Sequence, residues 1–430
     1  MSALSLRSRR VVTPDGVRPA SVVVADGVIT RVTGWGDAPA DVVDVGDDVV
    51  MPGLVDTHVH VNEPGRTEWE GFATATRAAA AGGVTTILDM PLNAVPATTT
   101  AAALQIKREA ARGRSLVRVE YIGGVVPGNA TELPALAAAG VRAFKCFLSP
   151  SGVDEFGHVT EADLREAFPV LQSLGLPLMV HAEDPACLLD APAGGSRRYL
   201  DWLGSRPAQA ERSAIAMLVR LMEEWPTPVH VVHVSSAGSL GIVSDAKARG
   251  LPLTVETCPH YLTFAAEEIP DGATEYKCAP PIRRTTERDA LWDALLDGEI
   301  DLVASDHSPC PPAMKGDRGD FFAAWGGIAS LQLGLSAVWT GARARGAGPE
   351  RVAEWMSAAP ARLAGLDDRR GRIAEGYDAD LVVWDPEASF VVNPRVLLHR
   401  HPVTPYAGRE LYGVVRHTFV AGRRVFPLTV

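Results

Sequence analysis

The chain has 430 residues, 47% of them hydrophobic, so it is long enough to bury a large core. Length alone suggests two or three domains, although a barrel of about 250 residues is common as a single unit. The net charge of −11 and the pI near 5.5 argue against nucleic acid or an anionic membrane as the main partner.

The cysteines and the N-terminus indicate where the protein resides. Five cysteines, odd in number and without a CxxC pair, are typical of reduced thiols rather than of a disulfide framework. The opening "MSALSLRSRRVVTPDG" has no apolar stretch of signal-peptide length, and no window approaches the roughly 20 apolar residues that cross a bilayer. We therefore expect a soluble, cytoplasmic protein whose partner is a small molecule.

The two ends of the chain share one sequence pattern. The first fifty residues alternate short β-rich runs with Asp-Gly dipeptides at 15–16 and 26–27, which are typical of hairpins. Similar runs return near the C-terminus, in "GRIAEGYDADLVVWDP" and "GVVRHTFVAGRRVF". We predict one small β-sandwich domain, to which residues 1–50 and 366–430 contribute the two parts.

Residues 51–365 repeat a different unit. Short apolar runs alternate with Ala- and Leu-rich segments of helical length, such as 70–81, 161–174 and 208–224. The eight β-like runs are 53–61, 84–90, 117–124, 142–148, 176–183, 228–235, 251–258 and 300–307. Eight βα units over roughly 300 residues indicate a (β/α)8 TIM barrel. A doubly wound open sheet is the alternative, which is weakened because no GxGxxG follows the first run.

Residues that can bind a metal lie in or at the ends of five of these runs. They are His58, His60, Lys145, His181, His233 and Asp306. Because the C-terminal strand ends of a TIM barrel meet at one mouth, we expect these six side chains to converge. Imidazoles and a carboxylate suit zinc or a similar divalent cation. His230 precedes His233 by three residues, so strand alternation predicts that it points to the other face and packs outside.

Lys145 is unusual in this set, because metal cations repel an ammonium. One interpretation is a strand-end lysine that reaches solvent. The other is a buried neutral amine that reacts with CO2 to give a carbamate able to bridge two metals, since desolvation and nearby positive charge both lower a lysine pKa. Two metals about 3.5–4 Å apart would activate water and polarise the carbonyl under attack. Asp306 would then move a proton from the nucleophile to the leaving nitrogen.

Several strings carry a family resemblance. The segments "DTHVH", "FKCFLS", "VHAE", "HVVHVSS", "ETCPHYL" and "SDHSPC" resemble the cyclic amidohydrolases of the amidohydrolase superfamily, which include dihydroorotases, hydantoinases or dihydropyrimidinases, and allantoinases. The finer strings "EPGRTEWEGF", "KCAPPIR", "SDHSPCPPAMK" and "AWGGIAS" are most similar to the allantoinases. The resemblance covers nearly the whole chain, including both β-rich ends.

The resemblance implies a catalytic site. Its metal ligands would be the six residues named above, holding two divalent ions, with zinc as the first expectation. Lys145 would be carboxylated (N6-carboxylysine) and bridge both ions, and Asp306 would be catalytic. Asn93 and the backbone around Ala279, where relatives often have serine, would contact the substrate. By family analogy we also expect a homotetramer.

Two further substrate positions depart from dihydroorotase. That relative has an arginine where this chain has Asn62 and a histidine where it has Cys310, and both hold the substrate carboxylate. A buried carboxylate without cationic partners would cost several kcal/mol. A substrate that lacks this carboxylate is therefore favoured, and allantoin is such a molecule.

Other polar residues of these strings receive supporting roles. We expect His260 and His307 to orient ligands or the aspartate, and Asp56 and Asp89 to accept hydrogen bonds behind the ligands. The Pro- and Gly-rich stretch 308–322 is long for a βα loop, which suggests a lid.

The sequence thus predicts a metal-dependent hydrolase of cyclic amides. The favoured reaction opens the hydantoin ring amide of allantoin to give allantoate, in purine and ureide catabolism. A hydantoinase or dihydropyrimidinase acting on other cyclic ureides is the alternative, followed by a dihydroorotase. A non-catalytic scaffold relative would have lost metal ligands, whereas all six positions are filled here.

Overall fold

The central part of the chain forms a parallel sheet of eight strands. The computed structural model describes residues 4–37 and 42–427, and this sheet has the order β13-β12-β11-β10-β9-β8-β7-β6. Its strands are β6 (Leu54–Val59), β7 (Val84–Asp89), β8 (Arg118–Gly124), β9 (Ala143–Phe147), β10 (Leu178–His181), β11 (Val229–Val231), β12 (Leu253–Thr257) and β13 (Leu302–Val303). All neighbours pair in parallel. The predicted α/β class with eight parallel strands is confirmed, whereas a doubly wound sheet would reverse its strand order.

The first and last strands of this sheet also approach each other. Val59 at the end of β6 forms a parallel bridge with His307, which follows β13, and the His60 amide donates to the His307 carbonyl at 2.9 Å. The C-terminal ends of β6 and β13 are therefore joined by backbone contacts at the same end of the sheet.

Helices alternate with these strands. They are α1 (Phe72–Ala81), α2 (Ala101–Ala111), α3 (Leu133–Ala138), α4 (Glu161–Leu174), α5 (Tyr199–Ser205), α6 (Ala208–Glu224), α7 (Leu240–Ala248), α8 (Pro259–Thr263), α9 (Thr285–Asp297), α10 (Gly334–Ala344), α11 (Pro349–Ala353) and α12 (Ala359–Leu363). The predicted segments 161–174 and 208–224 coincide with α4 and α6. Local signals explain this agreement: Thr160 and Asp163 form a capping box at the start of α4, and Gly175 ends it with φ 66°.

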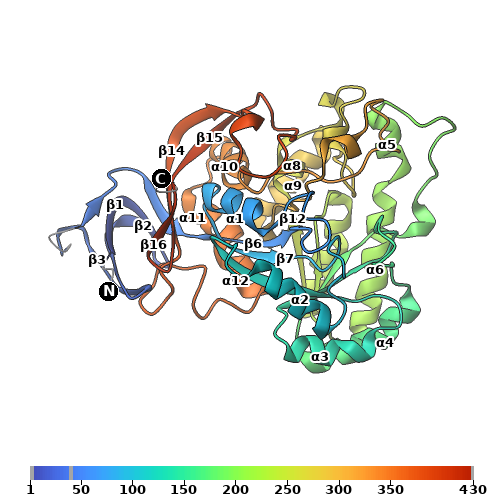
Figure 1. Ribbon diagram of the computed structural model, residues 1–430, viewed down its shortest axis with the longest axis horizontal. Coiled ribbons are helices and arrows are strands. Elements are labelled where there is room, and N and C mark those ends of the chain that lie inside the picture. The colour runs from blue at the N-terminus through green and yellow to red at the C-terminus, as the bar shows by residue number, and fades with distance from the viewer. Residues whose placement is uncertain (1–3, 38–41, 428–430) are drawn as a thin grey trace.

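The two ends of the chain meet in a second sheet, as the sequence predicts. Its strand order is β16-β15-β14-β5-β1-β2-β3, with β4 paired to β1. The strands are β1 (Leu4–Thr13), β2 (Gly16–Ala25), β3 (Val28–Gly34), β4 (Val43–Asp44), β5 (Val49–Pro52), β14 (Leu381–Val391), β15 (Glu410–Val420) and β16 (Arg423–Phe426). In Figure 1 the blue N-terminal strands and the dark red C-terminal strands lie side by side, where β5 pairs with β14. The division of this sheet into the two layers of a sandwich stays a prediction.

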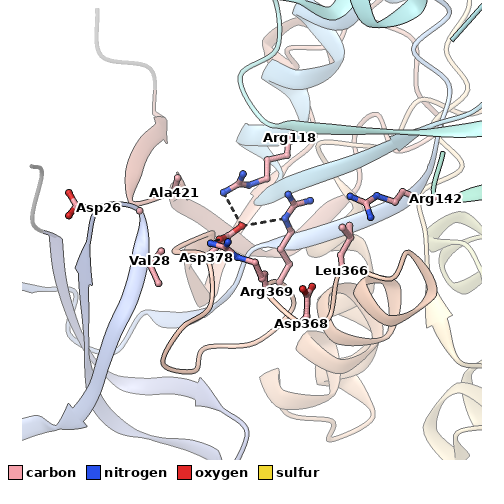
Figure 2. Close-up of a pocket in the computed structure, with 11 residues that line it drawn as sticks. Asp26, Val28, Arg118, Arg142, Leu366, Asp368, Arg369, Asp378 and Ala421 are labelled. Atoms are coloured by element: carbon pink, nitrogen blue, oxygen red, sulfur yellow. Dashed lines mark hydrogen bonds and ion pairs between the residues drawn. The ribbon is translucent and has the colours of Figure 1, made fainter. Parts of the chain in front are cut away.

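A cleft of about 420 Å³ between the terminal sheet and the parallel sheet holds a cluster of paired charges (Figure 2). Arg118, the first residue of β8, places Nη2 3.1 Å from Asp378 Oδ2 and Nε 2.7 Å from Asp380 Oδ2. Arg369 donates to the other oxygen of Asp378 at 2.5 Å. Because β8 begins at Arg118, this cleft lies at the N-terminal ends of the parallel strands, away from the predicted mouth. The cluster therefore connects the terminal sheet to the parallel sheet.

Candidate metal centre

His58, His60 and Asp306 converge at the C-terminal ends of β6 and β13. His58 Nε2 and His60 Nε2 lie 3.2 and 3.5 Å from the same oxygen, Oδ1 of Asp306. One ligand atom from each of the three residues lies within 4.8 Å of the other two, and all three side chains are buried. Two strand ends that are almost 250 positions apart in sequence thus supply one cluster of metal-binding atoms.

His181 and His233 form the neighbouring pair. His181 Nδ1 lies 3.1 Å from His233 Nε2, and the two ring centroids are 4.8 Å apart. The His233 ring is also 5.4 Å from that of His58, which connects this pair to the first cluster. Burial lowers the pKa of both His181 and His233, so both present neutral imidazoles, the form that binds a metal.

Lys145 lies in β9 and is fully buried, which excludes the solvent-reaching interpretation. Its Nζ donates to the Cys146 carbonyl at 2.7 Å and stands 3.7 Å from the centre of the Phe147 ring. Desolvation lowers the pKa of Lys145 to about 7, so a large fraction of the amine is neutral near neutral pH. Burial is the main cause that lowers the pKa of His181 and His233, and the charge of Lys145 adds to it, so Lys145 is close enough to this pair to act on it electrostatically.

Two carboxylates that the sequence analysis did not single out orient these histidines. Glu256 Oε1 lies 2.6 Å from His58 Nδ1, and Glu183 Oε2 lies 2.7 Å from His181 Nε2. Each imidazole therefore donates to a buried carboxylate through one nitrogen and presents the lone pair of the other nitrogen to the centre. Burial opposes the charge of Glu256, but His58 and His230 outweigh it and lower its pKa to about 2.

The expectation that His230 packs outside the barrel is wrong. His230 is fully buried, and its Nε2 lies 3.0 Å from Oε2 of Glu256, whose other oxygen contacts His58. Its Nδ1 lies 2.8 Å from Thr254 Oγ1 on the neighbouring strand. The prediction compared the directions of His230 and His233 as if both lay in one strand. Because β11 ends at Val231, the alternation of side chains along the strand cannot be extended to His233. His230 instead supports a ligand through Glu256.

The backbone is unusual where two of the predicted ligands stand. His233 and Asp306 have φ angles of 42° and 45°, and both lie past the last residue of their strands, β11 and β13. Asn62 and Asn93 also have positive φ, at 64° and 67°. Left-handed backbone is rarely adopted by residues other than glycine, and it clusters at functional sites where the surrounding fold enforces it. Left-handed backbone thus occurs at two proposed ligands and at two residues predicted to contact the substrate.

These donor atoms fit divalent cations. Burial lowers the pKa of His58, but the carboxylates of Asp306 and Glu256 outweigh it and raise this pKa, so a proton stands between His58 Nε2 and Asp306 Oδ1, 3.2 Å apart, where a cation would otherwise bind these two acceptors. Burial raises the pKa of Asp306, but the surrounding histidines outweigh it and hold this pKa well below the usual range, so the carboxylate stays charged. A cation among these atoms would satisfy both acceptors and His60 Nε2 at once.

The predicted substrate residues divide into two groups. A cavity of about 360 Å³ opens over the centre and is lined by His58, His60, His181, His233 and Asp306 together with Asn93 and Ala279. Asn62 and Cys310 are not among its lining residues: Asn62 Nδ2 donates to the Pro309 carbonyl at 3.3 Å, and Cys310 lines a separate small pocket. Direct contact of any of these four residues with the substrate stays a prediction.

The residues expected to support the centre are buried around it. Asp56 Oδ1 accepts from the amides of His58 and Ser305, at 3.2 and 3.1 Å, and thus ties the first strand end to the last. Asp89 Oδ1 accepts from the Val61 amide at 2.9 Å. These contacts agree with the acceptor role expected for both aspartates.

The two remaining histidines differ. His307 Nδ1 accepts from the Ser330 amide at 3.1 Å, which fixes the chain directly after Asp306. Both nitrogens of the fully buried His260 lack a hydrogen-bond partner among the described residues. A role of His260 in orienting ligands stays a prediction.

Comparison with known proteins agrees with this arrangement. Residues 49–425 match the amidohydrolase family, and the chain therefore belongs to that family. Its curated relatives include the allantoinase of Streptomyces avermitilis, which is 53% identical over 98% of this chain and 95% of its own length. The allantoinase of Arabidopsis thaliana is 44% identical over 98% of this chain and 87% of its own.

A solved structure extends the comparison to three dimensions. The L-hydantoinase (dihydropyrimidinase) of Arthrobacter aurescens superposes with a TM-score of 0.93 at 30% identity, over 99% of this chain and 96% of that one. The family resemblance seen in the sequence is thus confirmed. Among the described residues, no helix has the length and apolar character needed to cross a membrane.

Proposed function

We propose that the protein is an allantoinase, which hydrolyses the hydantoin ring amide of allantoin to allantoate in purine and ureide catabolism. The observation that carries this proposal is the convergence of His58, His60 and Asp306 beneath a cavity, in a chain 53% identical to an allantoinase over 98% of its length. The buried pair of His181 and His233 completes a set of donors that a hydrolase of cyclic amides would use.

The proposed metal ligands are His58, His60, Lys145, His181, His233 and Asp306. The ions, of which zinc is the first candidate, would supply a nucleophile from water at neutral pH and polarise the carbonyl that it attacks. Lys145 would hold both ions after its neutral Nζ adds to CO2 and loses a proton. The burial of Lys145 and its lowered pKa, about 7, support this step.

Asp306 is the proposed proton carrier. Its Oδ1 stands beside the Nε2 atoms of His58 and His60 and accepts a hydrogen bond from Ser308 Oγ at 3.0 Å. A carboxylate held at the cavity floor can accept a proton from the attacking water and deliver it to the ring nitrogen that leaves. The second carboxylate oxygen of Asp306 is available for this transfer when Oδ1 binds a cation.

The charges that line the cavity favour a neutral substrate. Its two cationic side chains are already engaged: Arg206 Nη2 lies 2.6 Å from Glu183 Oε2, and Lys277 Nζ donates to the Ala324 carbonyl at 2.6 Å. The carboxylate of dihydroorotate would lose water on entry and gain no unengaged cation from these lining residues. Allantoin instead carries a neutral ureido arm that amide and backbone groups can bind.

The substrate proposal is tested by comparing kcat/KM for allantoin, hydantoin, dihydrouracil and dihydroorotate on one metal-loaded sample. We expect allantoin to be hydrolysed fastest, and dihydroorotate at least about a hundredfold more slowly, since an unpaired buried charge costs several kcal/mol. A protein that hydrolysed dihydroorotate as well as allantoin would refute the argument from charge. Preference for hydantoin would instead favour the alternative, a hydantoinase.

A variant sharpens this comparison. Asn62→Arg introduces an unpaired cation two residues after His60, at a position with φ 64° that suits asparagine. We expect allantoin turnover to fall, and dihydroorotate turnover to rise from its low level. Asn62→Asp, similar in size but without the cation, is the matched control and should not raise dihydroorotate turnover.

Five broader features accompany the proposed function. We propose that the parallel sheet closes as a TIM barrel and that the terminal sheet folds into a β-sandwich. The boundaries proposed for these domains are 1–50, 51–365 and 366–430. We also propose a homotetramer, by analogy with the family, and a cytoplasmic location, which the scattered unpaired cysteines support.

A further inference from the structure

One wall of the cavity is a short backbone segment, Phe322–Gly327, called the wall segment below. All six of its residues line the cavity, and none of them belongs to a helix or strand. It begins at the last residue of the stretch 308–322, for which the sequence suggests a lid. Because four of its residues are alanine or glycine, the shape of this wall depends on the course of the backbone rather than on bulky side chains.

Two buried lysines bind the carbonyl oxygens of the wall segment. Lys277 Nζ donates to Phe322 O at 3.3 Å and to Ala324 O at 2.6 Å. Lys315 Nζ donates to Trp325 O at 3.1 Å and to Gly327 O at 2.6 Å. Four of the six carbonyls of the segment are thus held by two ammonium groups.

The two lysines that make these contacts are buried, which costs free energy of desolvation. Lys277 and Lys315 are only 7% and 8% exposed. Within the described residues, every hydrogen bond of the two Nζ atoms goes to a carbonyl of the wall segment. Burying an ammonium without a carboxylate is unfavourable, and desolvation accordingly lowers the pKa of Lys277 to about 8 and also lowers that of Lys315. Two such groups serve one six-residue segment.

Other contacts fix the ends of the segment to the same elements. The Gly327 amide donates to the Lys277 carbonyl at 2.7 Å, and the Trp325 amide donates to Met314 O at 2.8 Å. Gly327 has φ 123°, and a Cβ there would lie 2.3 Å from Ser308 O, so only glycine fits this close approach. The Trp325 ring packs edge-on against Trp69 at 5.1 Å.

We propose that Lys277 and Lys315 are positioning residues of the active site, which hold the wall segment by its carbonyls so that its backbone shapes the cavity for the cyclic ureide. Neither ammonium would take part in the chemistry. Their loss would loosen the wall and weaken substrate binding, while the metal centre on the opposite strand ends would remain intact. The choice of a ureide as the bound molecule rests on the proposed function.

The test uses the full, metal-loaded chain and the variants Lys277→Met and Lys315→Met, which keep an unbranched side chain one atom shorter than lysine and remove the donors. We expect KM for allantoin to rise about tenfold in each variant, a change in free energy similar to the net contribution of one charge-assisted hydrogen bond. The values of kcat and metal content should change less than about twofold. Hydrogen exchange measured by mass spectrometry should accelerate in peptides that cover the wall segment. Lys247→Met, which removes a partly exposed lysine paired with Asp301, is the matched control and should change neither KM nor the exchange rate of the wall segment.

Two results would overturn the proposal. One is unchanged KM together with unchanged exchange in the wall segment. The other is loss of metal and of kcat at constant KM, which would indicate a general structural role. Should Lys277→Met fail to fold, Lys277→Gln keeps a shorter donor and should give a smaller rise in KM. The exchange measurement needs no substrate, so it tests the wall segment even where allantoin proves not to be the substrate.

Discussion

Replacing Lys145 by alanine is expected to lower both metal content and allantoin turnover, the turnover by at least about a hundredfold. Residues that only support a metal ligand typically cost 10- to 100-fold when removed, and Lys145 is proposed to bind both ions directly. Without the carbamate, the two cations would face each other with no bridging anion, at a site whose other proposed ligands are four imidazoles and the single carboxylate of Asp306. Metal analysis and steady-state kinetics on the same sample measure the two effects.

Rescue distinguishes the carbamate from a packing role of Lys145. Formate or acetate should restore part of the activity of the alanine variant, since a small carboxylate can occupy the space left by the side chain. Lys247→Ala removes a partly exposed lysine of α7 that pairs with Asp301 and is not a proposed ligand, and it should behave as the wild type. Full metal occupancy and normal turnover in Lys145→Ala would exclude a bridging carbamate.

Exchanging Asp306 for asparagine is expected to reduce kcat by about 10²–10⁴-fold, the usual contribution of a positioned proton carrier. Asparagine keeps the size and one oxygen ligand, but it cannot accept a proton at neutral pH. Metal content should fall much less than kcat, because the other five ligands remain. Parallel measurement of kcat and bound metal therefore separates proton transfer from metal binding.

A neighbouring variant provides the comparison. Ser308→Ala removes the hydrogen bond to Asp306 Oδ1 but leaves the carboxylate in place, so its effect on kcat should be far smaller. If Asp306→Asn retained more than a tenth of the wild-type kcat, another group would have to carry the proton.

Much of the fold followed from the sequence because the signals are local. Each predicted run contains a strand of the parallel sheet, and α4 begins and ends where its capping box and Gly175 indicate. The convergence of His58, His60 and Asp306 also follows from local signals, once the ends of parallel strands are known to meet at one edge.

The supporting residues could not be found in this way. Glu256 lies 198 positions from His58 and Glu183 only two from His181, and neither spacing distinguishes them from surface carboxylates. The sequence does place each of them at the end of an apolar run, which is the one signal that could have identified them. His230 was assigned to the wrong face because alternation holds only inside a strand, and β11 is three residues long.

The lid expectation shows a similar limit. The composition of residues 308–322 suggests a loop over the mouth, and its two end residues, Ser308 and Phe322, line the cavity together with the residues up to Gly327. The carbonyls of Phe322–Gly327 accept from Lys277, which is distant in sequence, and from Lys315, which lies inside the stretch itself. A lone lysine in a sequence is usually read as exposed, so burial had to be seen before its role could be inferred.

Metal titration of the metal-free protein tests the central claim most directly. The account predicts no allantoin hydrolysis after chelation, and activity that rises with added Zn²⁺ until two equivalents per chain are bound, in the presence of bicarbonate. The bound ions should be accompanied by one equivalent of CO2 released on acidification, which reports the carbamate. Full allantoinase activity in the chelated protein, or saturation without any hydrolysis of allantoin, would contradict the account.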